Sequence, residues 1–279
     1  LAPTFKDSLQ LCDLARQRGV YGAVEFHKRY DDANLLLRRT LHEGRLGDIA
    51  YIMVEYSQRR QVREIFQSWV DKTDIFQYLG VHYADLIHFV TGARPVRVMA
   101  IGQRGMSSAK QDGWDSIETI IEWVPRGSGA RFASVIVASW IDPKRTSAMS
   151  DQKILVVGSA GRYQSDQKNR GVQIVTDEGI EDVNPYFSQI YKDVGGKVGI
   201  HGYGPASIRG FLEDVGALDQ GKITLDELEK NRPTFRQALV SSVIIDGVHQ
   251  SLSANGVWVD LENMGSNPLS DKPVLVSAT

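Results

Sequence analysis

The sequence predicts an α+β fold, in which a large, mostly antiparallel, open-faced sheet carries helices packed on one face. Two observations predict it. Five strand-like segments follow one another between residues 95 and 177 without a helical pattern between them, which favours antiparallel pairing. Helical patterns instead gather on either side of this block. The other face of such a sheet needs a cover, and a second copy of the chain would supply one.

The segments before the strand-rich block alternate between helical and strand-like patterns. They are, in order, a helix over residues 4–19, a strand over 20–26, a helix over 31–44, a strand over 48–58, a polar connection over 59–73 and a helix over 76–92. Thr4 is the predicted N-cap of the first helix. Gly19 and Gly92 follow the last residues of two helices, where a left-handed residue commonly ends a helix.

The strand-rich block and the segments after it complete the chain. The block contains strand-like segments at residues 95–105, 115–124, 130–142, 152–163 and 171–177. It is followed by a glycine-rich loop over 184–202, a helix over 206–221, a short helical turn over 226–229 and a helix over 234–255. Because no linker interrupts these segments, we expect a single domain over residues 1–279.

Composition excludes several classes of protein. The net charge is −2 with both signs interspersed, so there is no basic stripe for nucleic acid. No apolar run approaches the roughly 20 residues that a membrane helix needs. The only cysteine, Cys12, excludes an intramolecular disulfide, and its apolar helical surroundings favour a small buried residue over a nucleophile. A low cysteine count fits a reducing compartment, and we expect the cytoplasm.

Two motifs resemble cofactor sites and fail on closer reading. Residues 154–166 run from a strand into Gly158 and Gly161, but the G-x-G-x-x-G spacing is absent and no amphipathic helix follows, so we predict a β-turn. The six histidines are scattered, with no H-x-x-x-H or H-E-x-x-H pair, so no metal site is expected. Residues 195–204 contain five glycines without P-loop spacing. They indicate either a plain loop or one that closes over a substrate with His201 and Tyr203 at its tip.

The helix over residues 76–92 carries the main candidate site. On a helix, residues three and four apart share a face, which aligns Tyr78, His82 and Asp85. An imidazole flanked in this way can act as a general acid or base near neutral pH. The alternative is a core histidine satisfied by Asp85 or by a backbone carbonyl. Asp74, one turn before Tyr78, is a further substrate-binding candidate, and His88 lies on another side and is expected to be structural.

Several segments, in order, resemble the Gfo/Idh/MocA family, the group of glucose–fructose oxidoreductase and inositol dehydrogenase. They are the helix that follows the family's Glu-Lys-Pro motif, "AVEFHKRYDDA" for its Arg-Arg-Tyr/Phe-Asp-Pro segment, "LHEGRLGDIAYIMVEY" for the stretch into its first sheet strand, "GVHYADLIHFVTGARPVRVMA" for its Gly-x-His-x-x-Asp helix, "ILVVGSAGRYQSD" for its Gly-x-x-Gly turn, and "FRQALVSSVIIDGVHQSLSANGVWVDL" for its closing helix and strand. Each motif is loose, but their order and spacing cover nearly the whole chain.

The resemblance implies a division of labour. Members of the family carry an N-terminal Rossmann domain and a C-terminal α+β domain, and they move a hydride between NAD or NADP and a sugar or polyol carbon. This chain would then be the C-terminal substrate-binding and oligomerisation domain, and the absent first domain would hold the cofactor and the catalytic lysine. We therefore expect the chain alone to be inactive, and to form a homodimer or homotetramer through its sheet face.

Family roles transfer to individual positions. His82 matches the histidine proposed as acid or base on the substrate hydroxyl. Tyr78 stands where many members have aspartate, and a neutral phenol would not raise the proton affinity of the imidazole as a carboxylate does. Arg29 matches the second arginine of the Arg-Arg segment, with a role toward the substrate or the nicotinamide, or as a surface charge. Lys28 replaces the first arginine and is expected to be solvated.

Two residues at the end of a predicted sheet strand complete the candidates. Trp140 and Asp142 would form the floor of a sugar pocket, although Trp140 equally fits the core. The sequence thus favours one part of an NAD(P)-dependent oxidoreductase with a sugar-like substrate. The alternative, from another class, is a non-catalytic oligomerisation or sugar-sensing module, and it is motivated by Tyr78 and by the lack of a cofactor fold in these residues.

Overall fold

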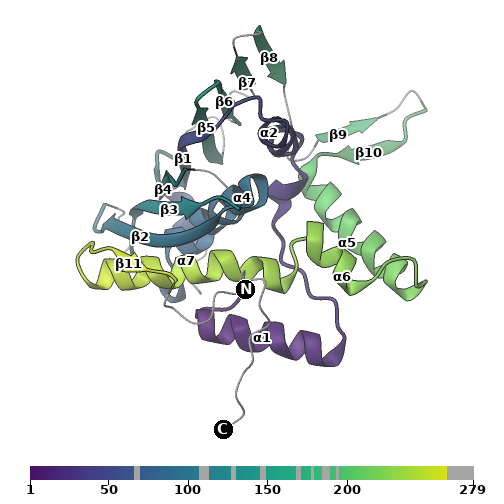
Figure 1. Ribbon diagram of the computed structural model, residues 1–279, viewed down its shortest axis with the longest axis horizontal. Coiled ribbons are helices and arrows are strands. Elements are labelled where there is room, and N and C mark those ends of the chain that lie inside the picture. Colours follow the sequence, from purple (N-terminus) through teal and green to yellow (C-terminus); the bar gives the residue numbers. More distant parts are fainter. Residues whose placement is uncertain are drawn as a thin grey trace.

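The predicted α+β architecture is confirmed by a computed structural model of the chain (Figure 1). The structure describes residues 1–65, 70–106, 113–126, 130–144, 149–167, 171–176, 179–183, 189–192 and 195–262. The helices are α1 (Phe5–Arg18), η1 (His27–Tyr30), α2 (Asp32–His42), α3 (Gln61–Ile65), η2 (Val70–Lys72), η3 (Phe76–Gly80), α4 (Val81–Thr91), α5 (Tyr203–Asp219), α6 (Leu225–Asn231) and α7 (Phe235–Ser253).

One large sheet dominates the described residues. Its strands are β1 (Ile49–Arg59), β2 (Arg94–Gln103), β3 (Ser116–Val124), β4 (Phe132–Asp142), β5 (Ser150–Gly158), β6 (Gly161–Asp166), β7 (Gly171–Thr176), β8 (Gly179–Val183) and β11 (Val259–Asp260), in the order β11-β2-β3-β4-β1-β5-β6-β7-β8. Within the described sheet only the β1–β4 pair is parallel. The mostly antiparallel sheet that the sequence predicts is therefore confirmed.

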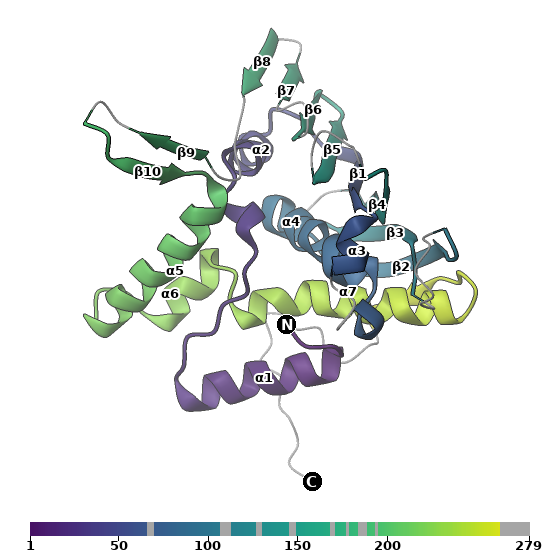
Figure 2. The ribbon, with the colours of Figure 1, turned by 180° about the vertical axis from the view of Figure 1, so that it is seen from behind.

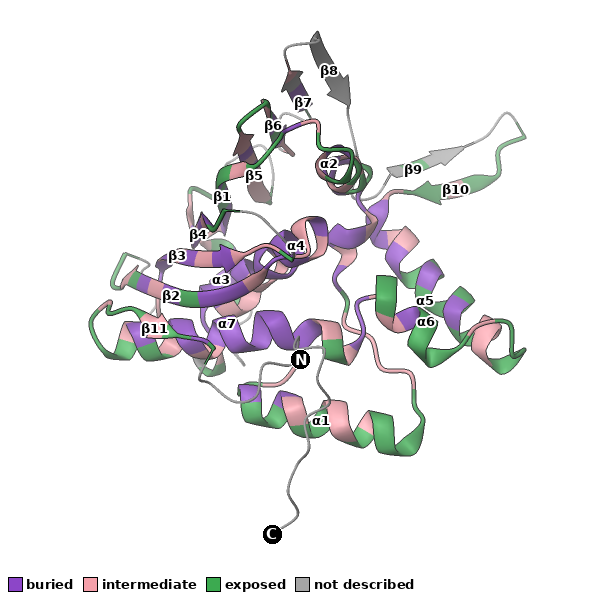
Figure 3. Ribbon diagram, viewed as in Figure 1, coloured by how far each residue is buried: buried purple, intermediate pink, exposed green. Residues whose placement is uncertain are grey.

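Helices α4 and α7 cover one face of this sheet, and α1 packs on α7 (Figures 1 and 2). The core lies between the helices and that face, where α4, α7 and the central strands are mostly buried (Figure 3). Alternation along the strands creates this division: Val54 and its cross-strand partner Ile136 are buried, whereas Met53, one position before Val54, is exposed. The opposite face of the central strands keeps exposed apolar residues, as an open-faced sheet does.

Capping and turn residues explain several boundaries. Thr4 is extended and its Oγ1 accepts a hydrogen bond from the Asp7 amide, while Gly19 has a φ of 62° after α1. Gly158 and Gly161 close the β5–β6 hairpin, which confirms the predicted β-turn. A Cβ at Gly158 would lie 2.1 Å from the Leu46 carbonyl oxygen, so only glycine lets this turn dock against the loop before β1.

Four segments differ from the prediction. Residues 20–26 are extended but form only an isolated bridge between Ala23 and Thr234. The polar connection over 59–73 contains α3 and η2. The expected loop over 184–202 contains the hairpin of β9 (Gln189–Lys192) and β10 (Val198–His201). Within these two segments, residues 66–69, 184–188 and 193–194 lie outside the described ones. The helix expected over 76–92 begins as a π-helical turn, η3, before α4.

Candidate functional site

His82 lies in the first turn of α4, directly after the π-helical turn. Gly80 makes this turn possible, because a Cβ there would lie 2.4 Å from the Phe76 ring. Tyr78 lies on this turn, and the centroid of its ring is 6.1 Å from that of the Trp140 ring. Asp85, the other expected neighbour of His82, pairs with Arg29. The Tyr78–His82–Asp85 alignment stays a prediction: His82 and Asp85 lie three residues apart on α4, while the carboxylate of Asp85 is engaged by Arg29.

The His82 ring is partly exposed and lies among aromatic neighbours. Its centroid is 6.1 Å from the Phe26 ring, edge to face, and 4.8 Å from the His27 ring. Its Nδ1 atom is buried and has no hydrogen-bond partner in the described part of the chain. Burial, followed by the charges of His27 and Lys28, lowers the pKa of His82 well below its usual value. His82 is thus a neutral imidazole at pH 7, with unused hydrogen-bonding capacity.

His27, at the start of η1, is held in a fixed orientation. Its Nδ1 atom lies 2.6 Å from Glu25 Oε2, and Ser207 donates to Glu25 Oε1 over 2.7 Å. Tyr203, the first residue of α5, stacks its ring 5.8 Å from the His27 ring. His27 and Glu25 were not selected from the sequence. Their signal was available, because residues two apart in an extended segment share a face.

Lys28 contradicts the expectation of a solvated charge, since it is 1% exposed. Its ammonium donates to Gln152 Oε1 and lies 4.7 Å and 5.1 Å from the centroids of the Tyr83 and Tyr56 rings. Burial lowers the pKa of Lys28 to about 8, against the opposing charge of Asp31. The Asp31 carboxylate in turn has a pKa of about 6, raised by burial and lowered in part by Lys28.

Arg29 is also buried, so the alternative of a surface charge is wrong. Its Nε and Nη2 atoms donate to the Asp85 carboxylate over 2.8 Å and 2.6 Å, and Nη1 donates to the Arg232 carbonyl over 3.3 Å. All three guanidinium nitrogens are therefore engaged within the protein. This bidentate pair ties η1 to α4 and leaves no guanidinium nitrogen uncommitted for the expected contact with substrate or cofactor.

The structure places three further candidates, Tyr203, Trp140 and Asp142, within its described residues. Tyr203 is buried beside His27, and its hydroxyl donates to Gln167 Oε1 over 3.2 Å. Trp140 is buried with its indole N–H on the Trp114 carbonyl, which favours the core role that the sequence left open. Asp142, partly exposed at the end of β4, accepts from the Ser57 hydroxyl over 2.7 Å.

The structure does not bring two other candidates to His82. Asp74 is buried at the start of η3, where it accepts from the Gln77 amide and lies 2.5 Å from Nε2 of His249 on α7. His201 is exposed at the end of β10, on a hairpin that extends away from the sheet beside α5 (Figure 1). His88 is buried with Nδ1 2.8 Å from the Ala93 carbonyl, as a structural histidine.

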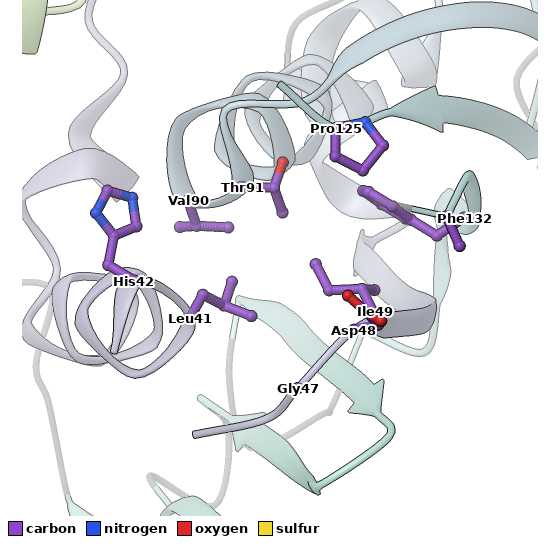
Figure 4. Close-up of a pocket in the computed structure, with 10 residues that line it drawn as sticks. Leu41, His42, Gly47, Asp48, Ile49, Val90, Thr91, Pro125 and Phe132 are labelled. Carbon is purple, nitrogen blue, oxygen red and sulfur yellow. The ribbon is translucent and has the colours of Figure 1, made fainter. Parts of the chain in front are cut away.

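The described residues line one cavity beside this cluster and another far from it. The first, of about 220 Å³, is lined by Glu25 and by other residues of the extended segment and α5, among them Tyr21 and Phe211. The other, of about 160 Å³, lies at the far end of α4 from His82, between Val90, Leu41 and Phe132 (Figure 4). Within the described residues, no group of His, Cys, Asp and Glu could hold a metal ion. None of the described helices is long and apolar enough to cross a membrane.

Fold and site together define an open-faced α+β domain with a histidine-centred polar cluster at the start of a sheet-covering helix. A comparison with protein-family models matches residues 35–164 to the GFO/IDH/MocA C-terminal domain. Residues 35–164 of this chain therefore belong to that family, and the resemblance drawn from the sequence is confirmed. A comparison with curated proteins finds no match.

Solved structures share the fold. An oxidoreductase from Agrobacterium radiobacter, in complex with NAD+, L-tartaric acid and magnesium, aligns over 94% of this chain and 71% of its own, with a TM-score of 0.71 and 15% identity. An inositol dehydrogenase homologue from Azotobacter vinelandii, in complex with NADH and myo-inositol, aligns over 92% of this chain and 69% of its own, with a TM-score of 0.65 and 18% identity. The WlbA dehydrogenase from Bordetella pertussis, in complex with NADH and UDP-GlcNAcA, aligns over 93% of this chain and 69% of its own, with a TM-score of 0.66 and 17% identity.

Proposed function

We propose that this chain is the substrate-binding part of an NAD(P)-dependent oxidoreductase that acts on a hydroxyl group of a sugar, polyol or related compound. The single observation that carries the proposal is His82, a partly exposed, neutral imidazole whose buried Nδ1 atom has no hydrogen-bond partner in the described part of the chain. A neutral imidazole can accept a hydroxyl proton, and here Nε2 is the nitrogen proposed to do so. Residues 1–279 would act as one substrate-binding and oligomerisation domain, and the cytoplasm is its proposed location.

The described residues supply the proton side of this reaction and no dinucleotide site. Residues 154–166 join two antiparallel strands, so no helix N-terminus meets a pyrophosphate there. A bound NAD or NADP would supply hydride acceptance. We assign its binding to that part of the related oxidoreductases which this chain does not match, since the chain spans about 70% of their length.

The chain's own residues prepare His82 for its role. Burial, and after it the nearby positive charges that include the buried Lys28 ammonium, lowers the pKa of His82 and so keeps the imidazole neutral, the form that can take a proton. Tyr203, whose ring stacks on that of His27, and Asp142, at the end of β4, are the proposed polar contacts to the substrate. The π-helical turn that presents His82 would fix its position relative to both.

The first test is a kinetic one on the intact protein, including its nucleotide-binding part. We expect a change in nicotinamide absorbance with a polyol or sugar, and we expect His82→Ala to lower the turnover number roughly 10²–10⁴-fold. His42→Ala is the matched control, because His42 lies at the end of α2 beside the distant cavity. Normal turnover by the His82 variant would remove that imidazole from the chemistry.

A second candidate function is a non-catalytic sugar-sensing or oligomerisation module. The observation that favours it is Tyr78, which stands at the position where many family members carry an acidic residue and whose ring packs on Trp140. Calorimetric binding of a polyol to the intact protein, without any absorbance change in the presence of the nicotinamide cofactor, would support this candidate over the first.

A further inference from the structure

We propose that Asp74 and His249 are positioning residues for His82: their ion pair ties the start of the helix that carries His82 to α7 and holds the π-helical turn η3 in place. The inference rests on the proposed function, because it concerns the residue to which that function gives the chemistry. The sequence suggested Asp74 as a direct contact to the substrate, whereas the role proposed for it acts through the helix.

Asp74 caps the helical segment that runs from η3 into α4. One of its carboxylate oxygens accepts from the Gln77 amide, three residues further on, over 2.8 Å, and its carbonyl oxygen accepts from the Tyr78 amide over 3.0 Å. An aspartate at this position satisfies an amide that the first turn of a helix leaves unpaired, and its charge suits the helix N-terminus. The cap therefore fixes the residue at which the helical segment begins.

The other carboxylate oxygen of Asp74 is held by α7. It lies 2.5 Å from Nε2 of His249, and the two side chains are 11% and 37% exposed. Burial alone would lower the pKa of His249, but the hydrogen bond to Asp74 and the charges of Asp74 and Asp246 raise it above its ordinary value. Asp246 also accepts from the Phe5 amide over 2.9 Å, which ties the start of α1 to the same part of α7.

The same helical segment is held a second time, after His82. The Asp85 carboxylate accepts from Nε and Nη2 of Arg29, on η1, over 2.8 Å and 2.6 Å. His82 thus lies between two anchored carboxylates, those of Asp74 and Asp85, and each attaches the segment to a different part of the protein. The position of His82 therefore depends on how the chain winds between these two anchors.

The π-helical turn lies between the first anchor and His82. Its hydrogen bond from the Val81 amide to the Phe76 carbonyl spans five residues, one more than an α-helical bond. Such turns are rare, and a costly local conformation persists where the surrounding contacts fix it. Release of Asp74 from α7 would let the segment return to α-helical winding, which rotates the residues before His82 relative to those after it. A general base that must reach the substrate hydroxyl loses rate from such a shift.

The ion pair is tested on this chain without cofactor or substrate, by NMR titration of its histidine rings. Asp74→Asn keeps an acceptor for the Gln77 amide but removes the negative charge beside the imidazole. We therefore expect the pKa of His249 to be lower in this variant than in the unmodified chain. The same pKa in both proteins would overturn the ion pair.

The effect on His82 is tested with two substitutions at one position. His249→Leu removes the bond to Asp74, so we expect the ring signals of His82 to shift. His249→Gln can place an amide N–H near the position of Nε2, and we expect the His82 signals to stay close to those of the unmodified chain.

The matched control is Ser251→Ala on the same helix. It removes the acceptor of the Ala100 amide, 2.8 Å away, and leaves Asp74 paired with His249. This variant should unfold more easily without moving the ring signals of His82. Unmoved His82 signals in His249→Leu, or an equal movement in Ser251→Ala, would overturn the positioning role.

The kinetic test uses the same variants of the intact protein. We expect His249→Leu to lower kcat roughly 10–10²-fold while KM changes little, and His249→Gln and Ser251→Ala to remain close to the unmodified protein. An unchanged kcat in His249→Leu would overturn the positioning role even if the NMR signals of His82 move. Absence of turnover by the unmodified intact protein would instead count against the proposed function, and the NMR titrations would still decide whether the pair positions His82.

Discussion

Lys28 is a charged residue in a position where charge is costly. Its ammonium is buried between two tyrosine rings, with Gln152 as its side-chain acceptor. A buried ion of this kind destabilises the folded state unless it is paired, and its persistence points to an electrostatic task. The neighbouring group on which this charge acts is His82, whose pKa Lys28 helps to lower.

The cost of this burial predicts a pH dependence of stability. The pKa of Lys28 is about 8 in the folded chain against an ordinary 10.5, so between these values the unfolded chain binds a proton that the folded chain has released. Folding stability therefore rises with pH through this window, by up to about 3 kcal/mol. We expect the stability of the unmodified chain relative to Lys28→Met to increase by this order between pH 7 and 10.5, measured by urea unfolding.

A matched control for this experiment is Lys222→Met, which removes an exposed ammonium after α5. Its unfolding free energy should follow that of the unmodified chain across the same pH range. If Lys28→Met also follows it, the Lys28 ammonium is not buried in solution, and the electrostatic role beside His82 has no basis.

Among the elements, the glycines show most directly how a single position fixes the geometry. Gly158 sits in the β5–β6 hairpin with the Leu46 carbonyl oxygen 2.1 Å from where its Cβ would be. Gly216 lies inside α5 with nothing within 4 Å of the same position. The same substitution should therefore act in opposite directions at the two sites.

Gly158→Ala should destabilise the chain by about 1–3 kcal/mol, because the methyl group meets backbone rather than a flexible side chain. Gly216→Ala should stabilise it by up to about 1 kcal/mol, since alanine loses less conformational freedom in a helix interior. Thermal and urea unfolding of both variants measure these changes. Equal effects at the two positions would contradict the docking of the hairpin against the loop before β1.

The same scale shows what the sequence could predict. Thr4, Gly19 and the Gly158–Gly161 turn were predictable because caps and turns depend on residues a few positions apart. The bond from Arg29 to Asp85 joins residues 56 positions apart, and no local pattern contains it. His82 could be selected as a residue type on a helix, but the π-helical turn that changes its neighbours depends on how Phe76 packs against Gly80.

For the whole molecule, the uncovered sheet face is the feature that needs a partner. In register across five strands, an apolar row runs through Leu155, Met53, Val135, Ile120 and Met99. Met53 is 49% exposed, and Tyr51 and Ile101 on the same face are 41% and 53% exposed. A contiguous apolar surface of this kind marks an interaction site, and a flat sheet face can meet its own copy around a two-fold axis.

We therefore expect the chain to form a dimer or tetramer through this face, and Met53→Asp to break it. A charge at the centre of the row would be buried unpaired in the complex, which should weaken association at least about tenfold, or roughly 1.4 kcal/mol. Sedimentation equilibrium over a range of concentrations measures the constant. The control is Leu212→Asp on α5, where the replaced side chain is 63% exposed but lies away from the sheet. If only the Leu212→Asp variant dissociates, the interface lies on α5 instead of the sheet. If the unsubstituted chain is a monomer, the apolar row binds a different partner, because so large an exposed apolar surface marks an interaction site.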